Sequence, residues 1–110
     1  MKIKAILIDA KNGLVKQVEI EDTNFCSDCY KHIGCDMIEG AMDVGGNALY
    51  VDEEGLCKEL DYAFIIQGGH QPFVGNGILV GYDAKKDKHM DCSLTVPEVY
   101  AMVQMARMDS

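Results

Sequence analysis

The first twenty residues carry a pattern of apolar and polar positions that predicts a β-hairpin. Residues 3–8 are apolar on both faces of a strand, so this strand is expected to lie inside a sheet. Asn12-Gly13 then supplies a strong turn signal, and residues 14–20 alternate as a half-buried partner strand would. The chain is therefore expected to open with two antiparallel strands.

A helix is predicted next, over about 24–33. Thr23 is a suitable N-cap residue, no Pro or Gly interrupts the segment, and Gly34 stands where a left-handed C-cap residue belongs. Cysteine fits the buried side of such a helix, because it is among the most buried residue types. The apolar positions recur at helical spacing and predict a core-facing stripe of Phe25, Cys29 and Ile33, widened by Cys26.

Further strands are predicted in the middle of the chain. Residues 37–42 and 48–51 indicate a second hairpin, joined through Gly45-Gly46, where positive φ carries no steric cost. One helical turn is expected at 56–60 and a short strand at 62–66.

The last third of the chain begins with a glycine-rich segment. Residues 67–77 are expected to be mostly loop, residues 78–82 a strand, and residues 83–91 a charged turn. These segments continue the succession of short strands and turns.

A second helix and the overall fold class follow. Thr95 and Glu98 match a capping box, which predicts that the last helix spans about 96–107. Strands joined by hairpins, with two helices at about 24–33 and 96–107, indicate an α+β fold with a mostly antiparallel sheet. With 110 residues and 48% hydrophobic content, the chain is expected to form a single domain over 1–110.

Composition narrows the partners and the compartment. The formal net charge of −8 at pH 7 argues against direct nucleic-acid binding, which depends on Lys and Arg replacing counterions on phosphates. The five cysteines show no paired spacing, so a reducing compartment is expected. The N-terminal apolar stretch stops at Asp9, too early for a signal peptide or a membrane span, so a cytoplasmic protein without membrane association is expected.

Three thiols and an imidazole fall at a regular spacing of three: Cys26, Cys29, His32 and Cys35. On a helix they would climb about 13 Å along the axis and could not all reach one ion, whose ligands must lie at about 2.0 to 2.3 Å. Packing is therefore the preferred interpretation, and no metal is predicted. The alternative is an irregular loop in which two of the cysteines bind metal together with His70 or His89.

The glycine-rich loop is the candidate ligand-binding site. Consecutive glycines allow backbone N–H groups to converge on an anion or a flat ligand, and polar and aromatic neighbours add contacts. Its spacing matches neither of the common phosphate-binding loops, and the alternative is a plain surface connection. The candidate residues are Gly68, Gly69, His70, Gln71, Phe73, Gly75, Asn76 and Gly77.

The densest acidic stretch is the candidate partner-binding surface. Only Lys58 offsets its charge locally, and a surface of this kind attracts a basic partner. The alternative role of the charges is solubility. The acidic residues are Asp52, Glu53, Glu54, Glu59 and Asp61.

No catalytic residue and no cofactor are predicted. Nucleophilic catalysis requires Cys or Ser, a histidine and an orienting group brought together in space. Cysteines and histidines are available, but none occupies a recognisable catalytic turn.

Several motifs occur in a characteristic order: strand 4–9, Val18-Glu19-Ile20, Ile33-Gly34 before Met37-Ile38-Glu39, the turn Tyr50-Val51-Asp52-Glu53-Glu54-Gly55-Leu56, and the strand 77–81. Over nearly the whole chain this order resembles the small proteins grouped as domain of unknown function 3846. The resemblance implies an accessory protein of a bacteriophage or mobile element, and it brings no catalytic residues. Cys26, Cys29 and Cys35 depart from the family pattern.

Two functional hypotheses follow. The first is a non-enzymatic accessory binding protein of a phage or mobile element that occupies a host macromolecule, such as a defence or regulatory protein with a basic surface. The second is a small-ligand binder that sequesters a nucleotide-like signal through the Gly68–Gly77 loop at a homo-oligomer interface. An enzyme of unknown type is a third alternative, for which the sequence provides no constellation.

Overall fold

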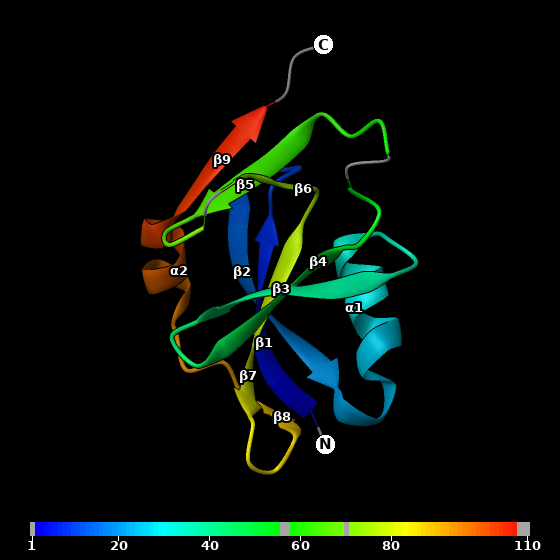
Figure 1. The fold of residues 1–110 in the computed structure, drawn as a ribbon, viewed down its shortest axis with the longest axis vertical. Coiled ribbons are helices and arrows are strands. Elements are labelled where there is room, and N and C mark those ends of the chain that lie inside the picture. The colour runs from blue at the N-terminus through cyan, green and yellow to red at the C-terminus, as the bar shows by residue number, and fades with distance from the viewer. Residues whose placement is uncertain (1, 56–57, 70, 108–110) are drawn as a thin grey trace.

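Two antiparallel sheets form the framework of the computed structural model, which describes residues 2–55, 58–69 and 71–107 (Figure 1). Their strands are β1 (Lys2–Asp9), β2 (Leu14–Glu21), β3 (Ile38–Val44), β4 (Asn47–Asp52), β5 (Tyr62–Ile66), β6 (Phe73–Val74), β7 (Gly77–Asp83), β8 (Lys88–Met90) and β9 (Val103–Arg107). The helices are the short 3₁₀ helix η1 (Asp22–Asn24), α1 (Phe25–Ile33) and α2 (Val96–Met102).

The larger sheet has the order β2-β1-β7-β4-β3, with β8 paired to β7, and the smaller sheet has the order β6-β5-β9. Every strand pair in the described part of the chain is antiparallel. The predicted α+β fold with antiparallel strands is therefore confirmed.

The predicted N-terminal hairpin is present. β1 pairs with β2 along its whole length, from Lys2 opposite Glu21 to Asp9 opposite Leu14. The Asp9 carboxylate closes the turn, because it accepts hydrogen bonds from the backbone N–H of Asn12 at 3.2 Å and from its side-chain amide at 2.9 Å. On its other edge β1 pairs with β7, so its predicted place inside a sheet is confirmed.

Helix α1 covers one face of the larger sheet (Figure 1). It ends as predicted, because Gly34 has a φ of 84° and its backbone N–H donates to the Tyr30 carbonyl over 2.8 Å. Its buried residues are Cys29 and Ile33. They pack in a cluster with Ile3, Ala5, Leu7, Ile20, Cys35, Ile78 and Val80.

Two predictions about the start of α1 are wrong. The N-cap residue is Asn24 rather than Thr23, which lies within η1, and no side chain caps the helix. Cys26 is exposed rather than part of the buried stripe, because burial on this helix is confined to Cys29 and Ile33. An exposed thiol therefore lies one turn before a buried one.

The opposite face of the larger sheet packs against the smaller sheet and α2. Neighbouring residues of β1 alternate between the two faces, with Leu7 under α1 and with Ile6 and Ile8 on the other side. There they join a second buried cluster that includes Phe64 of β5 and Val99 of α2. The larger sheet is thus the middle layer of three.

The C-terminal helix is shorter than predicted. The capping box is present, with the Thr95 N–H donating to the Glu98 carboxylate at 2.9 Å and the Glu98 N–H donating to the Thr95 hydroxyl at 3.3 Å. The helix nevertheless ends at Met102, and residues 103–107 form β9, which pairs with β5. Backbone hydrogen bonding to the open edge of β5 prevails over the local tendency to continue the helix.

The segment 83–91, predicted as a charged turn, contains strand β8. After β8 the chain crosses to β1, where the Cys92 N–H donates to the Lys4 carbonyl and the Lys4 N–H donates to the Asp91 carboxylate, each over 2.8 Å. This crossing needs Gly81, because a Cβ at that position would overlap the backbone carbonyl of Asp91.

The other predicted segments have these outcomes. The second hairpin is present as β3 and β4 and turns through Gly45 and Gly46, both of which have positive φ. The described residues of segment 67–77 are mostly loop and include the short strand β6. The helical turn predicted at 56–60 falls partly on residues 56 and 57, which lie outside the described residues. Within the described part of the chain, none of the helices η1, α1 and α2 has the length and apolar character that crossing a membrane requires.

Replacing Gly81 with Ala is expected to destabilise the fold by about 1 to 3 kcal/mol, the usual cost of overpacking. A backbone carbonyl cannot swing aside as the end of a side chain can, so β8 would have to separate from β7. Gly40→Ala in β3 is the matched control, because a Cβ there lies 3.7 Å from its nearest neighbour, Tyr50. Urea unfolding measures both variants, and equal midpoints would contradict the proposed need for Gly81.

Candidate functional site

One of the predicted acidic residues has a structural role. Asp52 is only 6% exposed. Its carboxylate forms a 2.7 Å salt bridge with Lys58 and accepts the backbone N–H of Glu54 at 2.9 Å. The hydrogen bond to Asp52 is the main reason that the pKa of Lys58 is raised. Lys58 is therefore bound to an inner carboxylate and does not neutralise the outer ones.

The other predicted acidic residues, Glu53, Glu54, Glu59 and Asp61, are exposed. Asp61 lies 3.5 Å from Arg107, and both side chains are mostly in solvent, which screens the pair. Glu53 is held at the start of β3, because its backbone N–H donates to the Met37 carbonyl at 3.0 Å.

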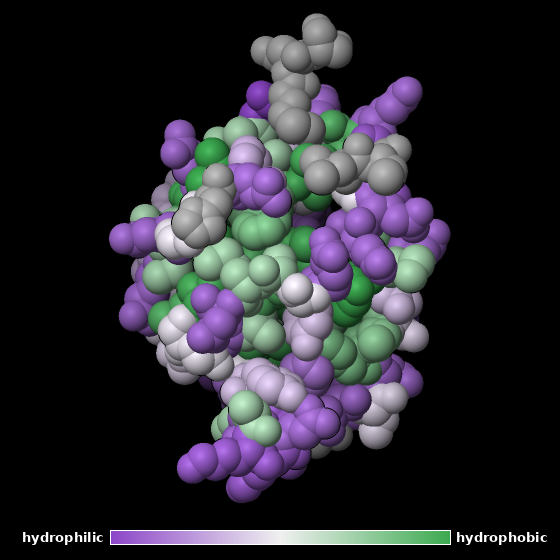
Figure 2. Space-filling model, viewed as in Figure 1, coloured by the Kyte–Doolittle hydropathy of each residue, from purple (hydrophilic) through white to green (hydrophobic). Residues whose placement is uncertain are grey.

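The contact between Glu53 and Met37 brings the predicted acidic stretch close to two further carboxylates, which precede it in the sequence by more than ten residues. Glu39 of β3 lines a small cavity together with Glu53, and Asp36 lines a shallow depression together with Lys58. Hydrophilic side chains gather at the right of Figure 2, beside the connection that follows β4 in Figure 1. We call this surface the acidic end, defined by Asp36, Glu39, Glu53, Glu54 and Glu59.

Several residues of the predicted glycine-rich site support the fold. Gly77 lies against Phe64, and a Cβ there would be 2.7 Å from the ring. The Phe73 ring packs on Phe64 with 5.5 Å between the centroids. The buried Asn76 side chain accepts the backbone N–H of Lys11 at 3.1 Å. These contacts join the loop to both sheets.

Two glycines in the described part of the loop have a left-handed backbone. Gly68 and Gly75 have φ values of 93° and 98°, and Gly69 packs close to the Ile66 carbonyl. Gln71 is exposed, and His70 lies outside the described residues.

The glycine-rich loop and the acidic stretch meet at one cavity of about 80 Å³. Its lining includes Gln71 and Phe73 from the loop and Glu39, Asp52 and Glu53 from the acidic side. Typical ligand pockets measure about 300 to 1,000 Å³. This cavity is therefore too small for a nucleotide-like ligand, and its carboxylates would repel a phosphate.

The cysteine-rich helix holds thiols of different accessibility. Cys29 and Cys35 are buried and Cys26 is exposed. Within residues 2–55, 58–69 and 71–107, no group of three or more His, Cys, Asp or Glu side chains is arranged to hold a metal ion.

An aromatic cluster surrounds His89, one of the alternative metal ligands. Its imidazole stacks on Phe25 at a centroid distance of 3.9 Å and an angle of 11°. The Tyr50 hydroxyl and His89 Nε2 share a hydrogen bond of 2.8 Å. The Tyr82 ring lies 5.5 Å from the imidazole, and its hydroxyl donates to the Asp87 carboxylate. The cluster fastens the first turn of α1 to β4, β7 and β8.

The sequence pattern does not predict this cluster, because it indicates a charged turn over 83–91. The available signal was the order Lys88-His89-Met90, in which the outer residues are exposed and the histidine is half-buried, as in a strand. Burial lowers the pKa of His89, and the charges of Asp22 and Asp87 offset this effect only in part. The neutral imidazole is therefore favoured in the folded protein.

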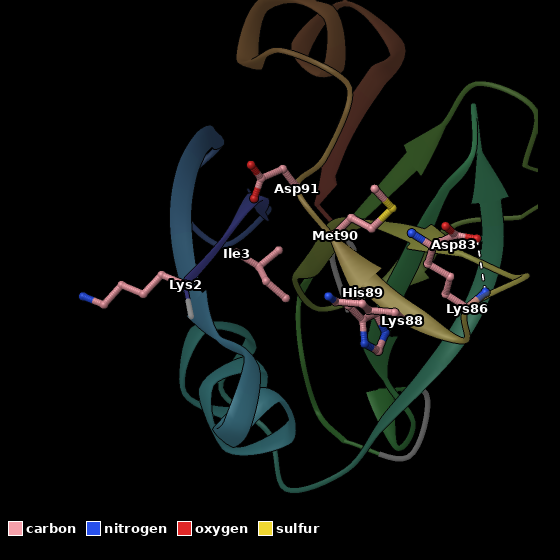
Figure 3. A pocket seen from close by; sticks show the side chains of 8 residues that line it. All are labelled: Lys2, Ile3, Asp83, Lys86, Lys88, His89, Met90 and Asp91. Carbon is pink, nitrogen blue, oxygen red and sulfur yellow. Dashed lines mark hydrogen bonds between the residues drawn. The ribbon is translucent and has the colours of Figure 1, made fainter.

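A cavity of about 320 Å³ opens next to this cluster, between the start of β1 and β8 (Figure 3). It is lined by Lys2, Ile3, Asp83, Lys86, Lys88, His89, Met90 and Asp91. Figure 3 shows Lys2 extending away from the other side chains. We call this cavity the β8 pocket.

Both carboxylates of the β8 pocket accept hydrogen bonds from the backbone. Asp83 accepts the N–H groups of Lys85 and Lys86 at 3.0 and 3.3 Å, and Asp91 accepts that of Lys4 at 2.8 Å. Lys86 and Lys88 are exposed, and no salt bridge within the described part of the chain engages them. The pocket thus offers free cations in an otherwise acidic protein.

Comparison with known proteins identifies the family. The model described as "Domain of unknown function (DUF3846)" matches residues 1–104. The chain belongs to the DUF3846 family. "Uncharacterized protein y4iR" of Sinorhizobium fredii is 24% identical over 98 residues, which make up 89% of this chain and 60% of that protein. The DUF3846 chain therefore spans 60% of the length of this curated relative. No solved structure matches the chain.

The stability of this DUF3846 protein is expected to fall in mild acid because of His89. Its folded-state pKa is lowered, so the contribution of the neutral imidazole is complete above the unfolded value of about 6.5 and is lost as the pH falls through the folded value. Protonated Nε2 can only donate, so the Tyr50 hydroxyl would then be confined to the acceptor role in this hydrogen bond.

Urea unfolding of the wild type and of His89→Gln, between about pH 8 and pH 5, measures this effect. The carboxylates are the same in both proteins, so the difference in their unfolding free energies isolates His89. That difference should narrow as the pH falls. A constant difference over this range would contradict the assignment.

Proposed function

We propose that this DUF3846 protein is a non-enzymatic binding protein whose acidic end occupies a basic surface on another macromolecule. The observation that carries the proposal is the convergence of exposed carboxylates from the start of β3 and from the segment after β4. Of the two lysines that line the depression at Asp36, Lys31 and Lys58, the second is already bound to Asp52. In the setting implied by the family resemblance, the protein is an accessory factor of a phage or mobile element, and its partner is a cytoplasmic host protein.

The charge distribution supports this function. The formal net charge is −8, yet lysines lie on the β7–β8 hairpin, which occupies the lower end of the molecule in Figure 1, away from the acidic end. Such a separation orients a basic partner before contact and raises its association rate. Solubility requires only net charge and does not require that carboxylates from separate segments be gathered on one side.

The partner is obtained by affinity capture from a bacterial lysate, and its association rate with the purified protein is then measured at several salt concentrations. The Debye length shrinks from about 30 Å at 0.01 M to about 10 Å at 0.1 M, so attraction by the acidic end should weaken across this range. Glu53→Lys with Glu54→Lys should slow association at low salt by at least about 10-fold and should leave stability within about 0.5 kcal/mol.

Glu19→Lys with Asp22→Lys is the matched control, because both carboxylates are exposed and the net charge changes by the same amount. It should bind nearly as fast as the wild type. Equal losses in the two double variants would mean that only net charge matters. A wild-type rate insensitive to salt would contradict the proposal.

A second candidate function is binding of a small, nucleotide-like anion in the β8 pocket. Its support is the volume of about 320 Å³, which lies within the usual range for ligands, together with the exposed Lys86 and Lys88. The His89 side chain also lines this pocket. The cavity at the glycine-rich loop, at about 80 Å³ and with an acidic lining, offers neither feature.

Calorimetric titration with a panel of nucleoside monophosphates and diphosphates tests this second function. Lys86→Glu with Lys88→Glu should abolish any binding, whereas Lys11→Glu with Lys16→Glu, at exposed positions elsewhere, should not. Absence of binding to the wild type, or equal binding by both double variants, would exclude the β8 pocket as a nucleotide site.

A further inference from the structure

Cys26 and Cys29 lie one turn apart on α1 and differ in accessibility. Cys26 is exposed, whereas Cys29 is fully buried in the cluster beneath the helix. Residues three apart on a helix lie on one face with their Cα atoms about 5 Å apart, within the roughly 4.4 to 6.8 Å that a disulfide spans. The Cα spacing of this pair therefore permits a disulfide.

Packing explains only one member of this pair. Cys29 fills the core as a small apolar side chain, but an exposed thiol at position 26 buries nothing. An accessible cysteine that precedes a buried one at the spacing Cys-X-X-Cys is the arrangement found in disulfide oxidoreductases. The presence of Cys26 thus calls for an explanation other than stability.

Burial and neighbouring groups raise the pKa values of Cys29 and of the nearby Tyr30. Burial raises the pKa of Cys29 to about 12, with further contributions from Cys26, Asp28 and Cys35. Burial and Cys26, through its charge and a side-chain hydrogen bond, raise the pKa of the Tyr30 hydroxyl. The raised pKa keeps the Cys29 thiol protonated in the folded protein near neutral pH.

We propose that Cys26 and Cys29 form a reversible dithiol–disulfide couple that exchanges with an external disulfide. Cys26 is the attacking thiol, because it alone of the pair is accessible to a reagent. Cys29 is the resolving thiol, one helical turn away.

The exchange with an external disulfide RS–SR has two steps. The Cys26 sulfur attacks one sulfur of RS–SR, the S–S bond breaks, and RS⁻ leaves and takes up the Cys26 proton. The Cys29 sulfur then attacks the Cys26 sulfur, releases the second RS⁻, and passes its own proton to it. Two protein thiols are oxidised by two electrons to one disulfide, and RS–SR is reduced to two RSH.

Equilibration of the full chain with glutathione buffers of graded ratio, followed by acid quenching, alkylation and peptide mass spectrometry, tests the couple. In the wild type, Cys26 and Cys29 should become resistant to alkylation together, at one common ratio of reduced to oxidised glutathione. The peptide that contains both cysteines should then be two hydrogen atoms lighter than its unalkylated, reduced form. Cys92 lies in the other core cluster, so the variant Cys92→Ser should form the same disulfide.

Two further variants separate the roles. Cys26→Ser, at an exposed position, should leave Cys29 fully reduced at every ratio. Cys29→Ala should trap Cys26 as a mixed disulfide with glutathione, and circular dichroism shows whether this variant remains folded. The proposal is overturned if wild-type Cys26 accumulates only as the glutathione adduct, or if either cysteine pairs instead with Cys35 or with another cysteine. If Cys29→Ala does not fold, the wild type and Cys26→Ser still decide the question.

Discussion

Strand β7 has to admit close neighbours at two points, and it does so with glycines. A Cβ at Gly77 would overlap the Phe64 ring of the smaller sheet, and a Cβ at Gly81 would overlap the Asp91 carbonyl. The first contact holds the two sheets together, and the second allows the chain to cross from β8 to β1. The β8 pocket and the His89 cluster both lie at that crossing, so both depend on the glycine at position 81.

Net negative charge opposes folding by self-repulsion, and the structure limits this cost in two ways. The one deeply placed carboxylate of the acidic stretch, Asp52, has both a cation and a backbone N–H as partners. The carboxylates of the acidic end stay in solvent, where water screens them. A carboxylate can be buried here because Lys58 is nearby, and this pairing in turn leaves the outer charges uncompensated. The same arrangement therefore serves stability and makes the surface attractive to cations.

Local signals predicted the parts of the fold that are local. The β1–β2 hairpin, the C-cap at Gly34 and the capping box at Thr95 depend on residues within a few positions of one another. Strand β9 could not be predicted in this way, because its strand conformation depends on the edge of β5, about forty residues earlier. The exposure of Cys26 likewise depends on where α1 meets the sheet and not on its own spacing.

The candidate sites also combine features visible in the local sequence with features that depend on contacts between distant segments. The acidic stretch was visible in the sequence, but the burial of Asp52 and the addition of Glu39 follow from the pairing of β3 with β4. The glycines of the loop suggested a ligand site because glycine permits close approach. In the structure the atoms that approach closely at Gly77 belong to Phe64, which is a protein side chain. A glycine-rich stretch thus indicates close contact without saying whether the neighbour is a ligand or the core.

Helix α1 connects features that are otherwise separate in the fold. Its first residue, Phe25, stacks on His89 beside the β8 pocket, and its next residue, Cys26, is the exposed thiol. Two turns later Ile33 anchors the helix in the core. No side chain caps the N-terminus of this helix, so the Phe25–His89 stack is a principal contact that holds its first turn. Any change at Cys26, or in the protonation of His89, therefore acts on the same turn, and through it on the edge of the β8 pocket.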